Sequence, residues 1–112
     1  MEAQKIIITG GATRIGAAIA EKLSGNNKEI VIQFNKSKLS AEKLKKKLSH
    51  NGTKIYLVKA DLSKDKDVKK IIKIAKAKLK YFDCLINNAS LFENDKLNNF
   101  TPQSWEKHIS IN

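Results

Sequence analysis

The sequence predicts an α/β fold in which one parallel β-sheet is covered by helices on both faces. Three observations predict it: four short apolar runs, three helical patterns between them, and turn residues at the junctions. A helix between two buried strands joins them in parallel through a right-handed crossover. We therefore expect the order β-α-β-α-β-α-β-α, the N-terminal half of a doubly wound sheet with strand order 3-2-1-4.

The four expected strands are short runs rich in isoleucine and valine. Branched side chains favour strands, and a run without polar alternation is typical of a strand buried on both faces. The first run ends at Gly10 and Gly11, which predict a tight turn. The four runs cover residues 5–9, 29–34, 54–58 and 83–87.

The first two expected helices follow the first two strands. Apolar residues spaced three and four apart predict a helix from Ile15 to Leu23. The helix is expected to end at residues 24–26, which include a glycine. Ser37 or Ser40 is expected to cap the second helix, because a serine side chain can accept a hydrogen bond from the first turn.

The third expected helix has the clearest pattern. Ser63 is its expected N-cap, and Asp65 and Asp67 lie in the first turn, where negative charge favours the helix dipole. The apolar positions that follow are spaced for one buried face: Val68, Ile71, Ile72, Ala75 and Leu79.

A fourth helix is expected to begin at Thr101 and Pro102, an N-cap followed by a proline at the first helical position. Trp105 starts its apolar face, and no glycine stop follows before Asn112. We therefore expect residues 1–112 to form one domain that is the N-terminal part of a longer chain.

The net charge of +11 by itself suggests a polyanionic partner, but the residue types oppose it. Of the 22 basic residues only Arg14 is an arginine, the side chain that best pairs with phosphates and base edges. Aromatic residues, which would stack on bases, make up 6%. We therefore expect solvated lysine-rich helix faces and no nucleic-acid partner.

Other classes are excluded by what the sequence lacks. No apolar run approaches the roughly 18 residues of a membrane span, and no secretory signal opens the chain, so we expect a cytoplasmic protein without a membrane partner. Cys84 is the only cysteine and is expected to be a small buried residue. Together with His50 and His108 it does not form a metal-ligand pattern, so no metal is expected.

The turn between the first strand and the first helix carries the strongest site signal. Its sequence is Thr9-Gly10-Gly11-Ala12-Thr13-Arg14-Ile15-Gly16. Glycine allows the sharp turn, and the free N–H groups of the following helix can bind a diphosphate. A bare structural turn would need glycine too, but the position between strand and helix favours a dinucleotide site.

These residues resemble the T-G-x-x-x-G-x-G fingerprint of the short-chain dehydrogenase/reductase family, whose Rossmann fold binds a nicotinamide dinucleotide. Three further matches extend the resemblance over the whole chain. Asn87-Asn88-Ala89-Ser90 is similar to the family's N-N-A-G, Asp61-Leu62 to its adenine-binding aspartate segment, and Asn112 to its catalytic asparagine.

Two departures from the pattern are similar to the pteridine-reductase-like branch of the family. Arg14 stands where the middle glycine is usual, and Ser90 replaces the last glycine of N-N-A-G. The Arg14 guanidinium can pair with a phosphate through two hydrogen bonds or point to solvent.

The end of the second strand favours NADP(H) over NAD(H). An acidic residue there would bind the ribose hydroxyls of NAD, but the sequence reads Asn35-Lys36-Ser37. Lys36 and Arg14 can neutralise a 2′-phosphate, although Lys36 can also be one more surface charge. The expected cofactor-binding residues are Gly10, Thr13, Arg14, Ile15, Gly16, Asn35, Lys36, Ser37, Asp61, Leu62, Asn87, Asn88 and Ala89.

The resemblance implies hydride transfer from NADP(H) to a carbonyl or pterin-like imine in a homo-oligomeric enzyme, a dimer or tetramer. It also implies a tyrosine followed four residues later by a lysine, but Tyr56 and Tyr81 lack that lysine. We therefore expect a cofactor-binding half that is inactive alone, with Asn112 as its one catalytic residue. The alternatives are a non-catalytic nucleotide-binding or regulatory module and, third, a basic polyanion binder.

Overall fold

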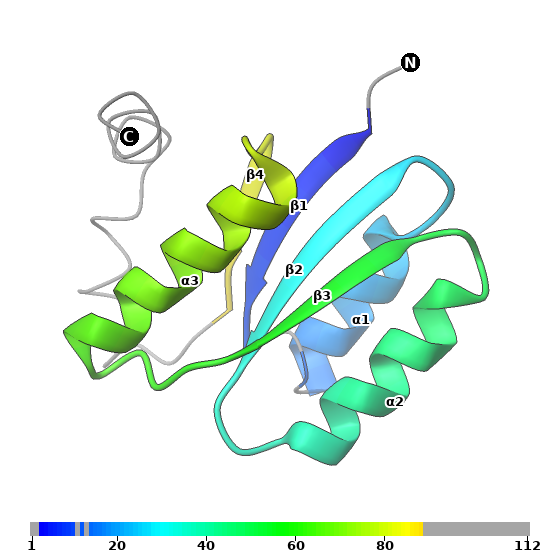
Figure 1. The fold of residues 1–112 in the computed structure, drawn as a ribbon. Helices are drawn as coiled ribbons and strands as arrows, with labels where there is room; N and C mark the ends of the chain where they lie inside the picture. Colours follow the sequence, from blue (N-terminus) through cyan, green and yellow to red (C-terminus); the bar gives the residue numbers. More distant parts are fainter. Residues whose placement is uncertain (1–2, 11, 13, 89–112) are drawn as a thin grey trace.

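The computed structural model describes residues 3–10, 12 and 14–88, and these form one four-stranded parallel sheet with three helices (Figure 1). The strand order is β3-β2-β1-β4, so the predicted order 3-2-1-4 is confirmed. The expected fourth helix, from Thr101 and Pro102 onward, lies outside the described residues. The elements are β1 (Gln4–Thr9), α1 (Arg14–Leu23), β2 (Lys28–Phe34), α2 (Lys38–Ser49), β3 (Lys54–Lys59), α3 (Asp65–Leu79) and β4 (Cys84–Asn87).

The helices lie in two layers, with α3 on one face of the sheet and α1 and α2 on the other (Figure 1). Because side chains alternate between the two faces of a strand, Ile7 and Val31 pack toward α3, while Ile6 and Ile30 pack toward α1 and α2. All four are at most 1% exposed. Burial on both faces explains why the central strands carry unbroken apolar runs.

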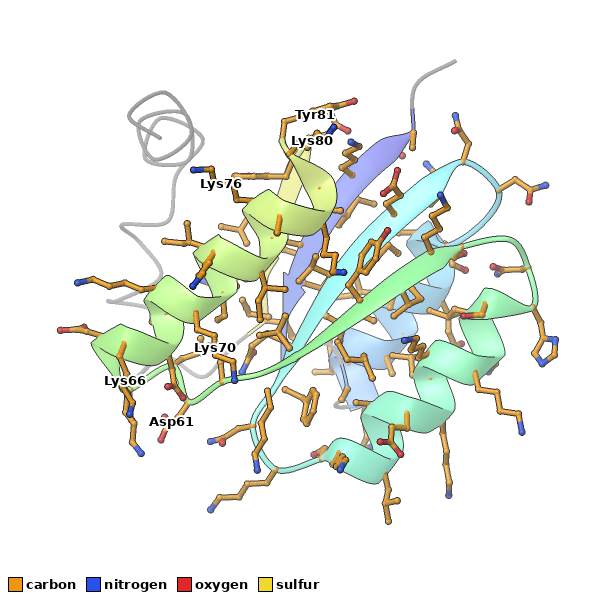
Figure 2. The ribbon with its side chains drawn as sticks, viewed as in Figure 1. Asp61, Lys66, Lys70, Lys76, Lys80 and Tyr81 are labelled. Carbon is orange, nitrogen blue, oxygen red and sulfur yellow. The ribbon has the colours of Figure 1, made fainter. Side chains whose placement is uncertain are left out.

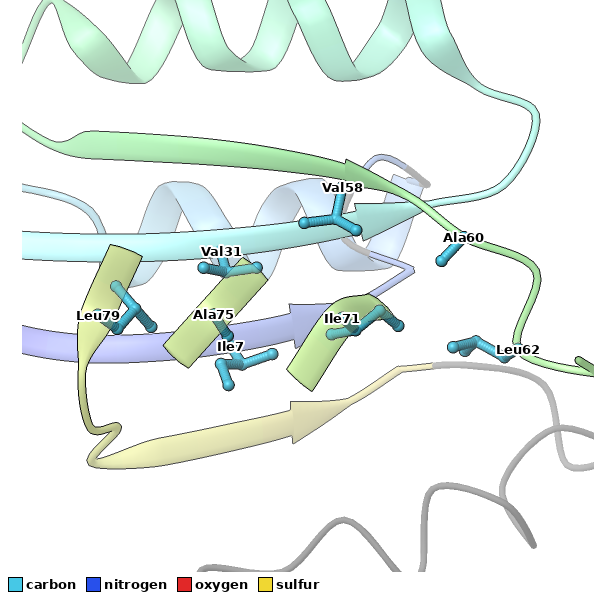
Figure 3. Packing of buried hydrophobic residues seen from close by; sticks show 8 residues of the cluster. All are labelled: Ile7, Val31, Val58, Ala60, Leu62, Ile71, Ala75 and Leu79. Atoms are coloured by element: carbon cyan, nitrogen blue, oxygen red, sulfur yellow. The ribbon is translucent and has the colours of Figure 1, made fainter. Parts of the chain in front are cut away.

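The cluster beneath α3 continues past the end of β3 into the following turn. Figure 3 shows Ala60 and Leu62 beyond the arrowhead of β3, in the same cluster as Ile71. Ala60 and Leu62 are each 1% exposed. The β3–α3 turn is therefore anchored in the core by its own side chains.

The amino-terminal edge of β4 is fastened to β1. Lys5 N–H donates to Asp83 Oδ2 at 2.7 Å, and Asp83 N–H donates to Lys5 O at 2.7 Å. The Lys5 ammonium also donates to Leu79 O at the end of α3. Cys84, expected to be buried, is only half-buried, because in the described part of the chain β4 is an edge strand.

Of the two predicted helix starts, that of α2 is confirmed in position and that of α3 is wrong. The N-cap of α3 is Lys64, while the Ser63 hydroxyl donates to Asp61 and caps no helix N–H. Ser37 occupies the N-cap of α2 without a side-chain hydrogen bond, and Ser40 lies inside that helix. Within the described residues, no helix has both the length and the apolar character needed to cross a bilayer.

Candidate functional site

The carboxyl ends of the four parallel strands meet at one edge of the sheet, which is where open α/β sheets bind ligands. The predicted site residues follow these strand ends, in the β1–α1, β2–α2 and β3–α3 turns and at the end of β4. The fold therefore brings to one edge motifs that are separated by up to 78 residues in sequence.

The β1–α1 turn needs glycine at its first position. Gly10 has a φ of +65°, a conformation that L side chains rarely adopt. A Cβ built there would lie 3.0 Å from the backbone oxygen of Asn88, closer than ordinary contact. The turn therefore passes close to the end of β4, and the missing side chain is what permits it.

Hydrogen bonds fasten this turn to the end of β4. The buried Thr9 hydroxyl oxygen accepts a hydrogen bond from Asn88 N–H at 3.1 Å and lies 3.3 Å from Asn87 Oδ1, to which it can donate. The Asn88 side chain donates to Gly10 O at 3.3 Å. The predicted pair Asn87 and Asn88 therefore positions the glycine turn.

Gln33 is a site residue that the sequence reasoning missed. It lies in β2 and is 3% exposed, yet it is polar. Its Oε1 accepts from Gly10 N–H at 2.7 Å, and its Nε2 donates to Ala60 O at 2.7 Å. One amide thus connects the β1–α1 turn to the β3–α3 turn. The available signal was a glutamine at the end of a run that is otherwise apolar.

The start of α1 is open to solvent on one side. Arg14 is its first residue and is exposed, Ile15 is 68% exposed, and Gly16 is buried. The groove there has a volume of about 830 Å³ and is lined by Arg14, Ile15, Ala18, Ile19, Lys22 and Asn88. The structure thus places three predicted site residues, Arg14, Ile15 and Asn88, around one groove.

The β2–α2 turn presents polar residues without a carboxylate. Asn35 and Ser37 are half-buried, and Lys36 is exposed. The charge of Lys36 contributes to lowering the pKa of Asp61, so the two side chains interact electrostatically across the gap between their turns. The cation expected to bind a 2′-phosphate therefore lies at the same edge as the aspartate.

Asp61 begins the β3–α3 turn and stays ionised. Hydrogen bonds from Ser63 lower its pKa most, and the charges of Lys64 and Lys36 lower it further. Leu62, the other predicted residue of this turn, has its side chain in the core. Asp61 therefore offers a charged, accessible acceptor on a turn that Leu62 anchors.

Some predicted residues are not placed. Thr13, Ala89 and Asn112 lie outside the described residues, as does Ser90. Within the described ranges, no cluster of three His, Cys, Asp or Glu side chains is arranged to hold a metal ion.

Tyr56, which lacks the following lysine, also differs in its electrostatics from the catalytic tyrosine that the resemblance implies. Its pKa is raised by burial and by the nearby carboxylate of Glu29, whereas the catalytic tyrosine of the resembled family has a lowered pKa. Its hydroxyl donates to Glu29 Oε1 at 3.4 Å within the sheet. These contacts indicate that Tyr56 has a structural role in the sheet.

Comparison with known proteins agrees with this geometry. An uncharacterised oxidoreductase of Methylorubrum extorquens is 25% identical over 112 residues, which are 100% of this chain and 45% of the relative. The FolM alternative dihydrofolate reductase 1 of Brucella suis, solved with NADP, is 28% identical with a TM-score of 0.74, over 95% of this chain and 50% of that one. The NADH-dependent reductase A1-R′, solved with NAD, is 25% identical with a TM-score of 0.70, over 80% and 37%.

The chain therefore spans less than half the length of the curated relative described above. A family model described as short chain dehydrogenase matches residues 4–112, nearly the whole sequence. The chain belongs to the short-chain dehydrogenase family.

Proposed function

We propose that this chain is the cofactor-binding half of an NADP(H)-dependent reductase. The observation that carries the proposal is the Gly10 turn, which has a positive φ and would place a Cβ only 3.0 Å from the backbone oxygen of Asn88. That turn leads into the N-terminus of α1, where free N–H groups and the helix dipole favour a diphosphate. Gly10, Thr13, Arg14, Ile15 and Gly16 would hold it.

The preference for NADP(H) rests on charge at the same edge. No carboxylate is present in residues 35–37, and Lys36 and Arg14 are exposed cations that can pair with a 2′-phosphate. Asn35 and Ser37 supply additional polar groups beside Lys36. Solved relatives include one with NADP and one with NAD, so the family alone does not decide between the cofactors.

The adenine end would lie against the β3–α3 turn. Asp61 supplies an acceptor for the adenine amino group, and Leu62 holds the turn in place. Asn87, Asn88 and Ala89 would complete the site at the end of β4. When bound, the nicotinamide supplies the hydride.

We assign the reductase a carbonyl or pterin-like imine substrate. The support is the Arg14 and Ser90 pattern and the likeness to an alternative dihydrofolate reductase. Asn112 would hold a water that relays protons. The proton-donating tyrosine and its lysine would come from residues beyond these 112, and the complete enzyme would be a homo-oligomer. A cytoplasmic location stays a prediction.

The test compares NADPH and NADH binding by calorimetry. Lys36→Ala should weaken NADPH binding about tenfold, the loss of one charge-assisted phosphate contact, and leave NADH binding unchanged. Lys46→Ala is the matched control, because Lys46 is an exposed lysine in the last turn of α2, away from the carboxyl edge. Equal losses for both dinucleotides would contradict the NADP assignment, and no binding of either would contradict the proposal as a whole.

A turnover assay distinguishes the cofactor half from a complete enzyme. The 112-residue chain should bind NADPH without oxidising it in the presence of a dihydropteridine or carbonyl substrate, because it carries no tyrosine followed four residues later by lysine. Oxidation of NADPH by the chain alone would show that another residue donates the proton. Binding with no turnover, even when the remaining half of a reductase is supplied, would favour the non-catalytic module.

A further inference from the structure

Ser63 donates two hydrogen bonds, one from its backbone N–H and one from its hydroxyl, to the same oxygen of Asp61. Ser63 N–H lies 2.9 Å and Ser63 Oγ 2.7 Å from Asp61 Oδ1. Two donors from one residue fix the direction of the carboxylate as well as its position. The Ser63 hydroxyl thus acts on Asp61, where a helix N-cap was expected.

The backbone of Asp61 is fixed independently. Asp61 N–H donates to Asp67 Oδ2 at 2.7 Å, and Asp61 O accepts from Lys64 N–H at 3.0 Å. Leu62, the next residue, is 1% exposed and packs in the cluster that contains Ile71 (Figure 3). Because the backbone is held on both sides, the orientation of the carboxylate depends on its side-chain contacts: the two hydrogen bonds from Ser63, with weaker attraction from the charges of Lys64 and Lys36.

The arrangement leaves one carboxylate oxygen available. Within the described residues no hydrogen bond reaches Asp61 Oδ2, and Figure 2 shows Asp61 at the edge of the molecule where β3 passes into α3. Because the pKa of Asp61 is lowered, the carboxylate is ionised at neutral pH, so this oxygen can accept a hydrogen bond but cannot donate one. An acceptor-only oxygen pairs with an amino group and repels a carbonyl oxygen.

Adenine and hypoxanthine differ in this respect, because adenine carries an amino group at C6 and hypoxanthine carries a carbonyl oxygen there. We propose that Ser63 is a positioning residue that aims the Asp61 carboxylate at C6 of the bound purine and so makes the site select adenine over hypoxanthine. The inference rests on the proposed function, since it requires a dinucleotide at this edge of the sheet. Asp67 supports it by holding the Asp61 backbone.

The experiment measures calorimetric affinity for NADPH and for its hypoxanthine analogue. The wild-type chain should prefer NADPH about tenfold, and Ser63→Ala should reduce that preference to about threefold. Ser63→Thr keeps the hydroxyl and should restore it. Ser24→Ala is the matched control, because the Ser24 hydroxyl also donates one local bond, to Glu21 O at 2.8 Å, and lies after α1 at the opposite edge.

Measuring NADPH affinity as a function of pH distinguishes a positioning role of Ser63 from a purely structural one, which would leave the pH dependence unchanged. The loss of NADPH affinity on acidification should begin at higher pH in Ser63→Ala, because removal of a hydrogen bond to the carboxylate raises the pKa of Asp61. Ser63 is exposed, so circular dichroism should show the variant folded.

The outcomes separate the two claims. An unchanged preference and an unchanged pH profile in Ser63→Ala, with the wild type binding NADPH, would overturn the role of Ser63 alone. Failure of the wild type to bind NADPH would overturn the proposed function and this inference with it.

Discussion

The β1–α1 and β3–α3 turns lie at the same edge of the sheet but are held in different ways. The first depends on partners distant in sequence: Gln33 accepts from Gly10 N–H, and the Asn88 side chain donates to Gly10 O. The second is held mainly by its own neighbours, since Ser63 and Asp67 both bond to Asp61.

This difference shows how each part of the proposed dinucleotide site is held in place. Gly10 has no side chain, so its backbone is held by Gln33 of β2 and by Asn88 after β4. The aspartate turn carries its own donors and is further held by the core anchor of Leu62 and by the bond from Gln33 to Ala60 O. A change in the sheet should therefore disturb the glycine turn more than a change of similar size disturbs the aspartate turn.

The largest effect is expected at Gln33, whose side-chain amide joins the two turns. Gln33→Leu removes the acceptor of Gly10 N–H and the donor to Ala60 O in a buried position. Losing two buried hydrogen bonds should lower the free energy of unfolding by about 3 kcal/mol, measured by urea denaturation. NADPH affinity should fall as well.

Gln4→Leu is the control, because it is the same substitution in β1 at an exposed position. Surface substitutions usually change the free energy of unfolding by less than about 0.5 kcal/mol. If both variants lost the same stability, the connection through Gln33 would carry no special weight.

A smaller loss is expected from Gly10→Ala. The positive φ costs an alanine about 1–2 kcal/mol, and the new methyl group would press on the backbone oxygen of Asn88. The free energy of unfolding should fall by at least that amount, and NADPH binding should be lost, as calorimetry can show.

Gly52→Ala separates strain from binding. Gly52 also has a positive φ, of +90°, but lies between α2 and β3 at the opposite edge, where a Cβ would overlap the side-chain oxygen of Asn26, the end of a side chain that can move away. The Gly52→Ala variant should lose stability and keep its affinity for NADPH. Loss of binding in both variants would mean that Gly10 acts only through the stability of the whole chain.

The smallest effect concerns pH and the aspartate turn. The folded-state pKa of Asp61 is lowered from its ordinary value of 3.8, so the ionised carboxylate stabilises the fold above pH 3.8. That contribution should disappear as the pH falls below 3.8 through the lowered pKa. It should be slight, because Asp61 is accessible to solvent.

Denaturation curves of the wild type and Asp61→Asn between pH 6 and pH 2 check this, over a range of about four pH units. The variant should lose less stability than the wild type in the acid part of the range. Parallel pH curves would show that Ser63 does not favour the ionised carboxylate.

The fold could be predicted almost completely from the sequence, because periodicity reports burial directly. The run from Ile6 to Ile8 has no polar alternation and proves to be covered on both faces. The spacing of Ile71, Ala75 and Leu79 likewise marks the face of α3 that packs on the sheet. The strand order followed from the doubly wound fold that alternating strands and helices predict.

The site could be predicted only where a local pattern carried it. Gly10 predicts its turn because few other residue types adopt a positive φ. Gln33 could not be assigned, since its partners Gly10 and Ala60 are 23 and 27 residues away and become neighbours only in the sheet. Ser63 was misassigned for the opposite reason: two local roles compete for a serine beside an aspartate, and the bond to Asp61 wins.

The two-ended contact of Gln33 also constrains how this sequence can evolve. One end of the amide must accept and the other must donate, so glutamate fails at Ala60 O and a hydrophobic residue fails at both ends. Both partners are backbone atoms, so no change of side chain at position 10 or 60 can compensate for loss of the amide. We therefore expect a survey of orthologues to find glutamine retained at position 33.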